Sequence, residues 1–359
     1  MGRDGWKGIQ HCRCNSNLII QNLKSDIPHP MSQLIDRFGR VHTNLRISVT
    51  DRCNFRCIYC MPEEGMKWLG RSELLSYEEI VQVVTIAAQL GIREVRLTGG
   101  EPLIRKDLPV LIEMLSRIEG IEEIAMTTNG FFLKKMADEL FDSGLNRINV
   151  SLDSLNPPKF SEIMRRDAVK EILEGLEVVE KTHIRPIKLN CVVIRGVNED
   201  EVIELAKLAR EKPYVVRFLE FMPIGNDDGW SMERVVPTQE IRDRIRSWKE
   251  LIQVETVRGS TPSADFTFTD GVGRIGFISP VSEPFCSECD RLRLTSDGKL
   301  RNCLFALEET DLKSILRNGG TDEDLRVAFH KSVQTKKPGH LIGQKEFIKP
   351  KKTMSQIGG

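Results

Sequence analysis

The chain has 359 residues, of which 40% are hydrophobic and 29% charged, as expected for one large globular domain or two ordinary ones. Its 52 basic and 52 acidic residues give a formal net charge of +0, which argues against a nucleic acid or a membrane surface as partner. No apolar run approaches the length of a membrane span. Six of the nine cysteines fall in closely spaced groups, which favours the reducing cytoplasm over a disulfide framework.

Residues 1–30 differ from the rest of the chain. They show no helical periodicity, carry scattered charges of both signs and lack the continuous apolar core of a secretory signal. We therefore expect this segment to be a disordered extension, or the result of a start site chosen too far upstream.

From residue 45 onward, short strands alternate with helices. Strands are predicted at 45–49, 94–98, 124–128, 147–151, 187–194 and 215–221, and helices at 77–90, 108–118, 134–143, 169–181 and 201–210. Ser76 and Glu79 form a capping box for the first helix, and Asn198 is expected to cap the last one. The alternation predicts parallel strands with right-handed crossovers. Six such units are too few to close an eight-stranded barrel.

Three cysteines, Cys53, Cys57 and Cys60, follow the first predicted strand with the spacing C-x3-C-x2-C. Three thiolates on one tight loop select an iron–sulfur cluster, zinc or copper(I). Structural zinc normally takes four protein ligands, but the nearest histidine, His42, has no recognisable ligand spacing. A cubane cluster held by three cysteines leaves one iron able to bind a small molecule. The spacing favours such a cluster, and zinc stays the alternative.

A second group, Cys286, Cys289 and Cys303, has the spacing C-x2-C-x13-C and again no obvious fourth ligand. Two such groups in one chain are compatible with an electron-transfer pair. Because a C-x2-C pair often binds zinc, a structural zinc site is the alternative here too.

Polar and glycine residues gather where the predicted strands end, which is where βα barrels place functional groups. Gly99-Gly100-Glu101 follows the second strand, Thr127 lies near the end of the third, Ser151 ends the fourth and Met222 follows the sixth. Paired glycines let backbone approach a ligand closely, although they are also common in ordinary strand-to-helix turns.

Four cations, Arg46, Arg96, Lys188 and Arg217, lie within predicted strands. A single strand cation is usually exposed at an edge or salt-bridged. Four of them on barrel strands, in a chain without net charge, predict an anion pocket if they point inward. Arginine suits phosphate because its planar fork donates two hydrogen bonds and stays charged.

Two features near the C-terminus stand out. Arg291 and Arg293 are two residues apart, so in an extended segment they share one face, either toward a common ligand or along a solvated strand edge. Gly358-Gly359 has no side chains and can thread a narrow cavity, although chain ends commonly fray.

The first cysteine run, with Tyr59 before its last cysteine, resembles the radical S-adenosylmethionine (SAM) superfamily. Segments 46–53, 285–305 and 352–359 resemble one family within it, the GTP 3′,8-cyclases or molybdenum cofactor biosynthesis protein A, and the resemblance spans 31–359. It implies an α/β fold: a partial (βα)6 TIM-type barrel over 31–222 and a C-terminal α+β region, 223–359, that carries a second iron–sulfur cluster. One departure is Lys352, where the family usually has arginine.

The resemblance implies a lyase that cyclises GTP to (8S)-3′,8-cyclo-7,8-dihydroguanosine 5′-triphosphate, the first step of molybdenum cofactor (molybdopterin) biosynthesis. In that reaction a 5′-deoxyadenosyl radical removes the ribose 3′ hydrogen. The implied cofactors are two 4Fe-4S clusters and SAM. The implied partners are GTP, an electron donor such as flavodoxin or ferredoxin, a downstream cyclic pyranopterin monophosphate synthase and a second copy of the chain. Two alternatives stay open: another radical SAM enzyme with an auxiliary cluster, and a non-enzymatic iron–sulfur or zinc protein.

The same resemblance assigns individual residues. It gives the first cluster to Cys53, Cys57 and Cys60, and the second to Cys286, Cys289 and Cys303. It gives SAM to Tyr59, Gly99, Gly100, Glu101, Ser151 and Met222. It gives GTP to Arg46, Arg96, Thr127, Lys188, Arg217, Arg291, Leu292 and Arg293. It gives a catalytic role, inside the active site, to Gly358 and Gly359.

Overall fold

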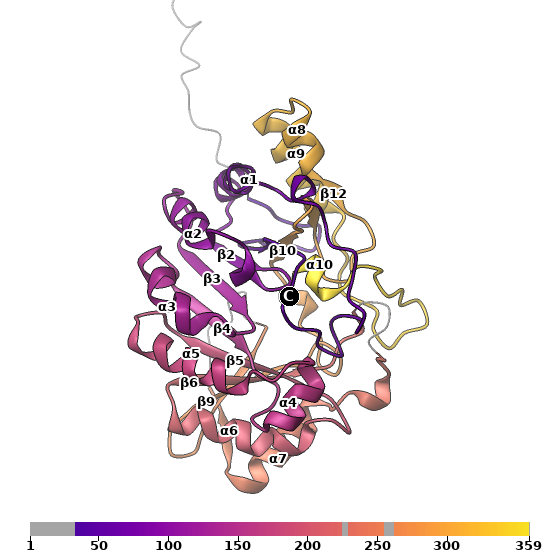
Figure 1. Ribbon diagram of the computed structural model, residues 1–359. Helices are drawn as coiled ribbons and strands as arrows, with labels where there is room; N and C mark the ends of the chain where they lie inside the picture. Colours follow the sequence, from indigo (N-terminus) through magenta and orange to yellow (C-terminus); the bar gives the residue numbers. More distant parts are fainter. Residues whose placement is uncertain (1–32, 225–228, 255–261, 359) are drawn as a thin grey trace, which may run out of the picture. The chain divides into compact units, whose positions relative to one another are not determined.

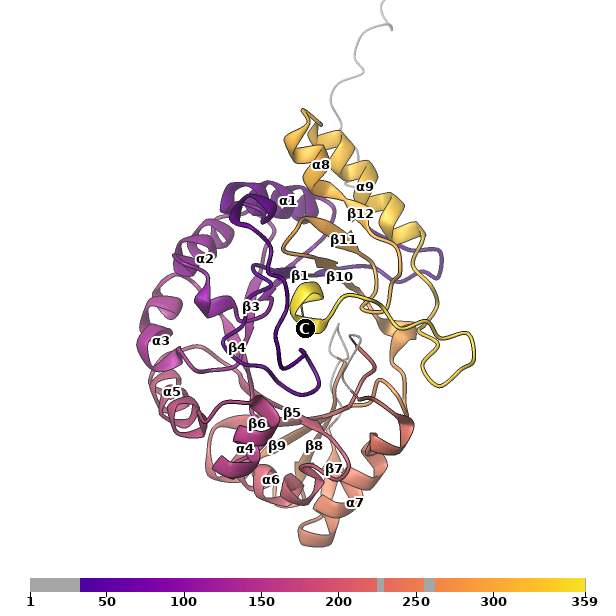
Figure 2. The ribbon, with the colours of Figure 1, turned by 45° about the vertical axis from the view of Figure 1, so that its right-hand side comes forward.

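The strands that carry the site form one long, curved sheet, surrounded by helices (Figures 1 and 2). The computed structural model describes residues 33–224, 229–254 and 262–358, so the expectations for residues 1–30 and for Gly359 lie outside the described residues. The strands are β1 (Asn44–Ser48), β2 (Glu94–Thr98), β3 (Glu123–Thr128), β4 (Arg147–Ser151), β5 (Ile187–Val193), β6 (Tyr214–Glu220), β7 (Leu251–Gln253), β8 (Ala264–Phe268), β9 (Arg274–Ile278), β10 (Arg291–Leu294), β11 (Lys299–Arg301) and β12 (Thr310–Asp311). The helices are α1 (Tyr77–Gln89), α2 (Leu108–Ser116), α3 (Leu133–Asp142), α4 (Pro157–Met164), α5 (Val169–Lys181), α6 (Val202–Glu211), α7 (Thr238–Trp248), α8 (Leu312–Arg317), α9 (Asp322–Gln334) and α10 (Met354–Ile357).

The sheet is an open barrel. Its strand order is β12-β11-β10-β1-β2-β3-β4-β5-β6-β9-β8-β7, and every neighbouring pair from β10 to β9 is parallel. The expected α/β fold with a partial βα barrel is therefore confirmed. Two strands from the C-terminal part, β9 and β10, extend the parallel portion beyond the six expected strands. A boundary between 222 and 223 stays a prediction.

Helices α1, α2, α3, α5 and α6 form where the sequence predicts them and cover the outer face of the sheet, whereas α10 lies on the inner side of the barrel (Figure 2). The capping box of α1 is confirmed: the Ser76 hydroxyl accepts from Glu79 N–H, and the Glu79 carboxylate accepts from Ser76 N–H. Along β1, Leu45 and Ile47 are fully buried in the hydrophobic core and alternate with Arg46. This period of two sends apolar side chains to the helices and polar ones into the barrel.

One helix start differs from the prediction. Asn198 does not cap α6, which begins at Val202 after a short 3-10 turn, and it makes no capping hydrogen bond. Its amide instead donates to the carbonyls of Asp153 and Val192 and accepts from Ile194 N–H. The Asn198 side chain therefore stabilises the loop after β5 and does not cap α6. Helix α4 was not predicted at all.

The C-terminal part is fastened to the barrel by a buried carboxylate at the end of β6. Glu220 is 0% exposed, and it accepts hydrogen bonds from the backbone N–H groups of Thr238 (2.9 Å), Val281 (2.8 Å) and Ser282 (2.9 Å). Charge-assisted bonds of this kind are among the stronger hydrogen bonds in proteins. Among the described residues, no helix is long and apolar enough to cross a membrane.

Candidate active site

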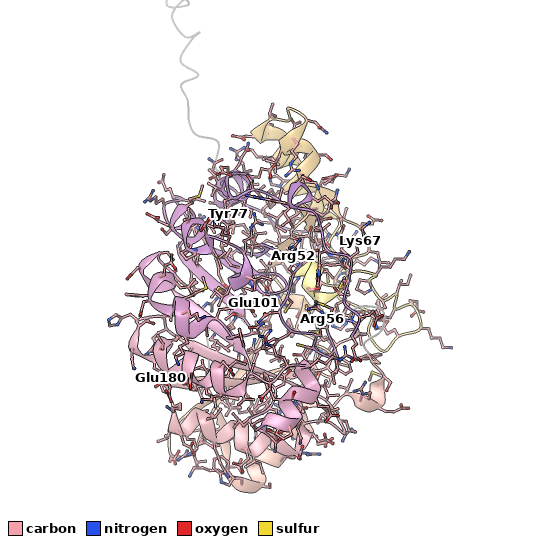
Figure 3. The ribbon with its side chains drawn as sticks, in the orientation of Figure 1. Arg52, Arg56, Lys67, Tyr77, Glu101 and Glu180 are labelled. Atoms are coloured by element: carbon pink, nitrogen blue, oxygen red, sulfur yellow. The ribbon has the colours of Figure 1, made fainter. Side chains whose placement is uncertain are left out.

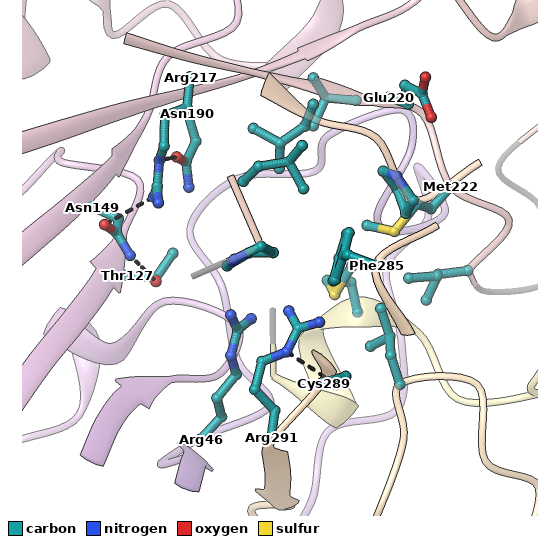
Figure 4. A pocket seen from close by; sticks show the side chains of 18 of the residues that line it. Arg46, Thr127, Asn149, Asn190, Arg217, Glu220, Met222, Phe285, Cys289 and Arg291 are labelled. Carbon is teal, nitrogen blue, oxygen red and sulfur yellow. Dashed lines mark hydrogen bonds between the residues drawn. The ribbon is translucent and has the colours of Figure 1, made fainter. Parts of the chain in front are cut away.

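A cavity of about 250 Å³ lies inside the barrel at the carboxyl ends of the strands. Figure 4 shows Arg46 and Arg291 entering it from one side, with Arg217, Asn190 and Asn149 on the other. The sequence-predicted residues that line it are Arg46, Tyr59, Arg96, Thr127, Ser151, Lys188, Arg217, Met222, Cys286, Cys289, Arg291, Arg293 and Cys303. Candidates for SAM, for GTP and for the second cluster thus meet in one cavity.

Strand register explains why the cations converge. Arg293 on β10 is paired with Arg46 on β1, and Arg46 is paired with Arg96 on β2. Since paired residues on parallel strands point to the same face, these side chains all point into the barrel. Arg293 is therefore flanked by strands on both sides, and the alternative of a solvated strand edge is wrong.

Several of these cations have few internal partners. Arg46 has no ion pair or hydrogen-bonded Nε among the described residues, and burial together with Arg293 and Arg291 holds its pKa well below the usual value. Burial and the neighbouring Arg217 lower the pKa of Lys188 to about 8. Crowded, buried cations repel one another, so an anion in the cavity would relieve an existing strain.

Arg217 is held in place by two amides. Its Nε donates to Asn190 Oδ1 and its Nη2 to Asn149 Oδ1, each at 2.9 Å, and Asn149 Nδ2 in turn donates to the Thr127 hydroxyl at 3.2 Å (Figure 4). Neutral partners orient the guanidinium without cancelling its charge. Burial and the nearby Arg96 lower the pKa of Arg217 to about 9.

Arg96 is compensated, unlike Arg46. Its Nη2 lies 2.7 Å from Glu94 Oε1, and Arg147 contacts the same carboxylate. For Arg96 the salt-bridged interpretation of a strand cation is thus correct, although the residue also lines the cavity.

The glycines after β2 fix the first cysteine loop. A Cβ on Gly99 would lie 2.3 Å from the Thr50 carbonyl oxygen, and one on Gly100 would lie 2.2 Å from that of Arg52. Gly100 N–H donates to Thr50 O and Glu101 N–H to Arg52 O, both at 2.8 Å. Side chains are excluded here because the strand end packs directly on the segment that leads into Cys53.

The Glu101 carboxylate is fully buried and accepts from Leu103 N–H (3.0 Å), the Thr128 hydroxyl and Asn129 N–H (both 2.7 Å). Burial raises its pKa to about 7. In Figure 3 Glu101 lies in the interior, beside the ends of the strands. Its side chain thus connects the ends of β2 and β3, and Gly99, Gly100 and Glu101 do not themselves line the cavity.

The thiols of Cys53, Cys57 and Cys60 interact with one another and are poorly solvated. Burial, followed by the neighbouring thiols or Glu101, raises the pKa of Cys53 to about 11 and that of Cys60 to about 12. Burial, the thiols of Cys60 and Cys53 and the Asp153 carboxylate hold the pKa of Cys57 well above its usual value. Within the described residues, no three His, Cys, Asp or Glu side chains are close enough to hold a single metal ion.

The aromatic residue of this loop is locked by a carboxylate. The Tyr59 hydroxyl donates to Asp153 Oδ2 at 2.5 Å, and Asp153 Oδ1 accepts from Val192 N–H at 2.8 Å. Burial raises the pKa of Asp153 to about 6. Tyr59 therefore faces the cavity together with Ser151 and Met222, with its ring position fixed by β4 and β5.

The second cysteine group has a different electrostatic environment. Burial opposes ionisation of Cys289, but Arg291 and Lys336 outweigh it and lower the pKa of this thiol to about 6. Arg291 Nε donates to Cys289 Sγ at 3.4 Å (Figure 4). Burial raises the pKa of Cys286. All three thiols of this group line the cavity.

The C-terminal segment inserts at the ends of β1 and β2. Ile357 is fully buried, Arg293 Nη1 donates to the Gly358 carbonyl, and a Cβ on Gly358 would lie 2.8 Å from Thr98 Cγ2 and 3.2 Å from Ser48 Cβ. Gly358 also has φ +87°, which disfavours other residues. A frayed end is excluded up to Gly358. Lys352 Nζ contacts Glu309 at 2.9 Å and holds the tail as a point charge.

Leu292 differs from its neighbours. Its side chain is 0% exposed in the hydrophobic core, and Leu292 does not line the cavity. Sequence reasoning also missed several lining residues: Arg147, Asn149, Asp153, Asn190, Phe285 and His340. The period of two would have indicated Asn149 from Ser151 and Asn190 from Lys188. No local signal indicates His340.

Comparisons with known proteins agree with this geometry. The Radical SAM superfamily profile matches residues 47–209, and the Molybdenum Cofactor Synthesis C profile matches residues 214–342. The crystal structure of Streptococcus suis SuiB bound to S-adenosylmethionine has a TM-score of 0.58 at 14% identity, covering 80% of this chain and 69% of SuiB, and thus shares the fold alone. The chain is a radical SAM enzyme with a C-terminal molybdenum cofactor synthesis region.

Closer relatives define the family. A GTP 3′,8-cyclase of Thermodesulfovibrio yellowstonii is 46% identical over 326 residues, covering 90% of this chain and 99% of the relative. A GTP 3′,8-cyclase of Streptomyces coelicolor is 44% identical over 328 residues, covering 91% and 96%. The chain belongs to the GTP 3′,8-cyclase family.

Proposed function

We propose that this chain cyclises GTP to (8S)-3′,8-cyclo-7,8-dihydroguanosine 5′-triphosphate, the first step of molybdenum cofactor biosynthesis. One observation carries the proposal: a single cavity is lined by Tyr59, Ser151 and Met222, by a set of strand cations, and by three thiols of the second group. The radical source and the anchoring cluster can thus act on the same anionic substrate molecule. Membership of the GTP 3′,8-cyclase family supports the same reaction.

The two cysteine groups fit 4Fe-4S clusters in their donor chemistry. Thiolates are the ligands that hold such clusters, and all seven cysteines in the described residues are free. Cys53, Cys57 and Cys60 would hold the first cluster, and Cys286, Cys289 and Cys303 the second. When bound, the first cluster and SAM supply the 5′-deoxyadenosyl radical that removes the ribose 3′ hydrogen, while the second cluster anchors the guanine.

The residues of the chain then position and protect the substrate. Within the described part of the chain Arg46 and Lys188 have no ion pair to break when the triphosphate binds, and Arg217 is already oriented by its two amides. Charge-assisted hydrogen bonds of this kind contribute about 1.5–3 kcal/mol each. Holding C3′ of the ribose next to C8 of guanine is a matter of proximity, which can lower a barrier by several kcal/mol, roughly 7 or more in well-oriented cases.

Apolar side chains limit water at the reacting atoms. Leu219, Phe221, Ile278 and Phe285 line the cavity between the cations and the second cysteine group. A dry site protects a radical from side reactions. Gly358 is seated against Thr98 and Ser48, and Met354 of the same C-terminal segment lines the cavity, which supports a positioning role for the tail.

The test is turnover by anaerobically reconstituted protein with GTP, SAM and a chemical reductant, with products identified by mass spectrometry. The proposal predicts the cyclised nucleotide and one 5′-deoxyadenosine per product. Reactions without SAM, or with ATP in place of GTP, serve as controls. Cleavage of SAM that is indifferent to GTP, or activity on a peptide substrate instead, would contradict it.

The proposed function also includes an electron donor, an enzyme that takes the product, an oligomeric state and a compartment. We infer that a flavodoxin or ferredoxin delivers electrons, that a cyclic pyranopterin monophosphate synthase takes the product, that the chain works as a homodimer, and that it resides in the cytoplasm. The unstable product and the need for a low-potential electron support the first two. The free thiols support a reducing compartment.

A further inference from the structure

The ammonium group of Lys336 is buried against the backbone of the second cysteine loop. Lys336, two residues after α9, is only 2% exposed. Its Nζ donates to the carbonyl oxygens of Cys289 and Arg291, both at 3.0 Å, and lies 2.9 Å from His42 Nε2. The Nζ group also lies 3.7 Å from Cys289 Sγ. Its three hydrogens therefore all point to the loop or to one imidazole.

The imidazole is in the right form to accept. His42 Nδ1 lies 3.2 Å from the Leu34 carbonyl, which can only accept, so the ring proton is on Nδ1 and Nε2 is the free acceptor for Lys336. Burial, followed by the charge of Lys336, lowers the pKa of His42 to about 4. His42 is thus neutral and leaves the charge of Lys336 uncompensated.

No ion pair between Lys336 and a carboxylate is present in the described residues. Burial lowers the pKa of Lys336, and the guanidiniums of Arg40 and Arg291 act in the same direction, whereas the thiols of Cys289 and Cys303 favour the charged ammonium. Asp290 is nearby in sequence, but its Oδ2 accepts instead from the Thr43 hydroxyl at 2.7 Å. Burying an unpaired ammonium is costly. Asp36 Oδ2 lies 3.8 Å from His42 Nε2 but is paired with Arg40, so the thiols of Cys289 and Cys303 are the groups that favour the charge of Lys336.

The neighbouring cation shows the contrast. Arg40 Nη1 donates to the Cys286 carbonyl at 2.7 Å and Nη2 to the Lys337 carbonyl at 2.8 Å, so Arg40 also holds the loop. Its Nε, however, is paired with Asp36 Oδ2 at 2.6 Å. The charge of Arg40 is neutralised by Asp36, whereas Lys336 has no carboxylate partner in the described residues and directs its positive charge toward Cys289.

We propose that Lys336 is a positioning residue of the second cysteine group. Its ammonium holds the backbone of Cys289 and Arg291 in place, and its charge balances the ligating thiolate and stabilises the reduced form of the cluster bound there. The inference rests on the proposed function, because it requires that cluster. It predicts a property of the cluster that is independent of turnover.

The experiment measures the midpoint potential of the second cluster alone. Full-length protein with Cys53, Cys57 and Cys60 replaced by alanine is the parent, so that only the second cluster contributes to an EPR-monitored redox titration. Lys336→Met in this parent should lower the potential by at least 59 mV, a tenfold shift of a one-electron equilibrium toward the oxidised form. Lys337→Met, which removes the same charge from an exposed neighbour, should leave the potential unchanged.

Each outcome has a defined reading. Equal potentials and equal iron content in the parent and Lys336→Met would overturn the inference and leave the proposed function intact. A parent that binds no cluster at all would instead contradict the proposed function. Loss of iron from Lys336→Met but not from Lys337→Met supports the anchoring role. If Lys336→Met does not fold, Lys336→Gln, which keeps a donor without the charge, is read in its place by the same criteria.

Discussion

The two cysteine groups contain the same number of thiols but lie in opposite electrostatic environments. Around Cys60, burial and a neighbouring thiol raise the pKa to about 12, and the loop relies on backbone contacts with the glycines after β2. Around Cys289, Arg291 and Lys336 overcome burial and lower the pKa to about 6. The difference indicates that Cys289 of the second group is held toward its thiolate form, whereas burial favours the protonated form of Cys286 and of the first group's thiols, which release protons when metal binds.

The largest expected effect separates the two roles. Cys57→Ala should abolish formation of 5′-deoxyadenosine, because the first cluster loses a ligand, while Cys289→Ala should keep some SAM cleavage and lose cyclisation of GTP. Both products are quantified by liquid chromatography of anaerobic reactions. Cys191→Ala is the control, since Cys191 is a buried core residue that belongs to neither group. Full cyclase activity in Cys289→Ala would show that Cys289 is not needed for cyclisation of GTP.

The apoprotein offers a direct comparison of the thiols. Because the pKa of Cys289 is depressed to about 6 and that of Cys60 raised to about 12, iodoacetamide at pH 7 should modify Cys289 at least tenfold faster. The rate at Cys289 should fall as pH drops through about 6, where its thiolate is protonated. Peptide mapping by mass spectrometry gives both rates. Equal rates would remove the contrast between the groups.

Substitution of an oriented cation should weaken GTP binding selectively. Arg217→Ala removes a guanidinium that lines the cavity and is fixed by Asn149 and Asn190, so KM for GTP should rise roughly 10- to 100-fold, or about 1.5–3 kcal/mol. The Kd for SAM should stay the same. Arg117→Ala, which removes an exposed arginine directly after α2, is the matched control. A rise in the Kd for SAM without a rise in the KM for GTP would show that Arg217 contacts SAM and not GTP.

The tail should give the smallest effect. Gly358→Ala introduces a Cβ against Thr98 and Ser48, and it should slow cyclisation on the order of tenfold by displacing the tail. Gly319→Ala is the control, because Gly319 also has a positive φ (+78°) but no neighbour within 4 Å of the added Cβ. Equal rates for the two variants would mean that backbone strain, and not the seat of Gly358, accounts for any change.

The sequence allowed the repeating part of the fold to be predicted, because each βα unit carries its own pattern of apolar and polar residues and the first helix also carries a capping box. It did not reveal that β10 pairs with β1, since Arg293 and Arg46 are far apart in the chain and their pairing depends on the assembled sheet. The cap assigned to Asn198 failed because its side chain is engaged by the Asp153 carbonyl.

For the site, the cysteine spacings and strand cations were visible locally. The residues that orient these side chains or shift their pKa values could not be recognised from the local sequence. Asn149 and Asn190 follow from strand alternation once a neighbour is known to point inward. Lys336 and His42 have no local signal, because their role arises only where two distant segments pack behind Cys289.

The central claim is that GTP occupies the cavity between the two cysteine groups with its ribose next to the radical source. Turnover of GTP deuterated at C3′ tests it most directly. The account predicts transfer of one deuterium into 5′-deoxyadenosine, in step with formation of the cyclised nucleotide. Deuterium-free 5′-deoxyadenosine, accompanied by product that retains the label at C3′, would contradict it.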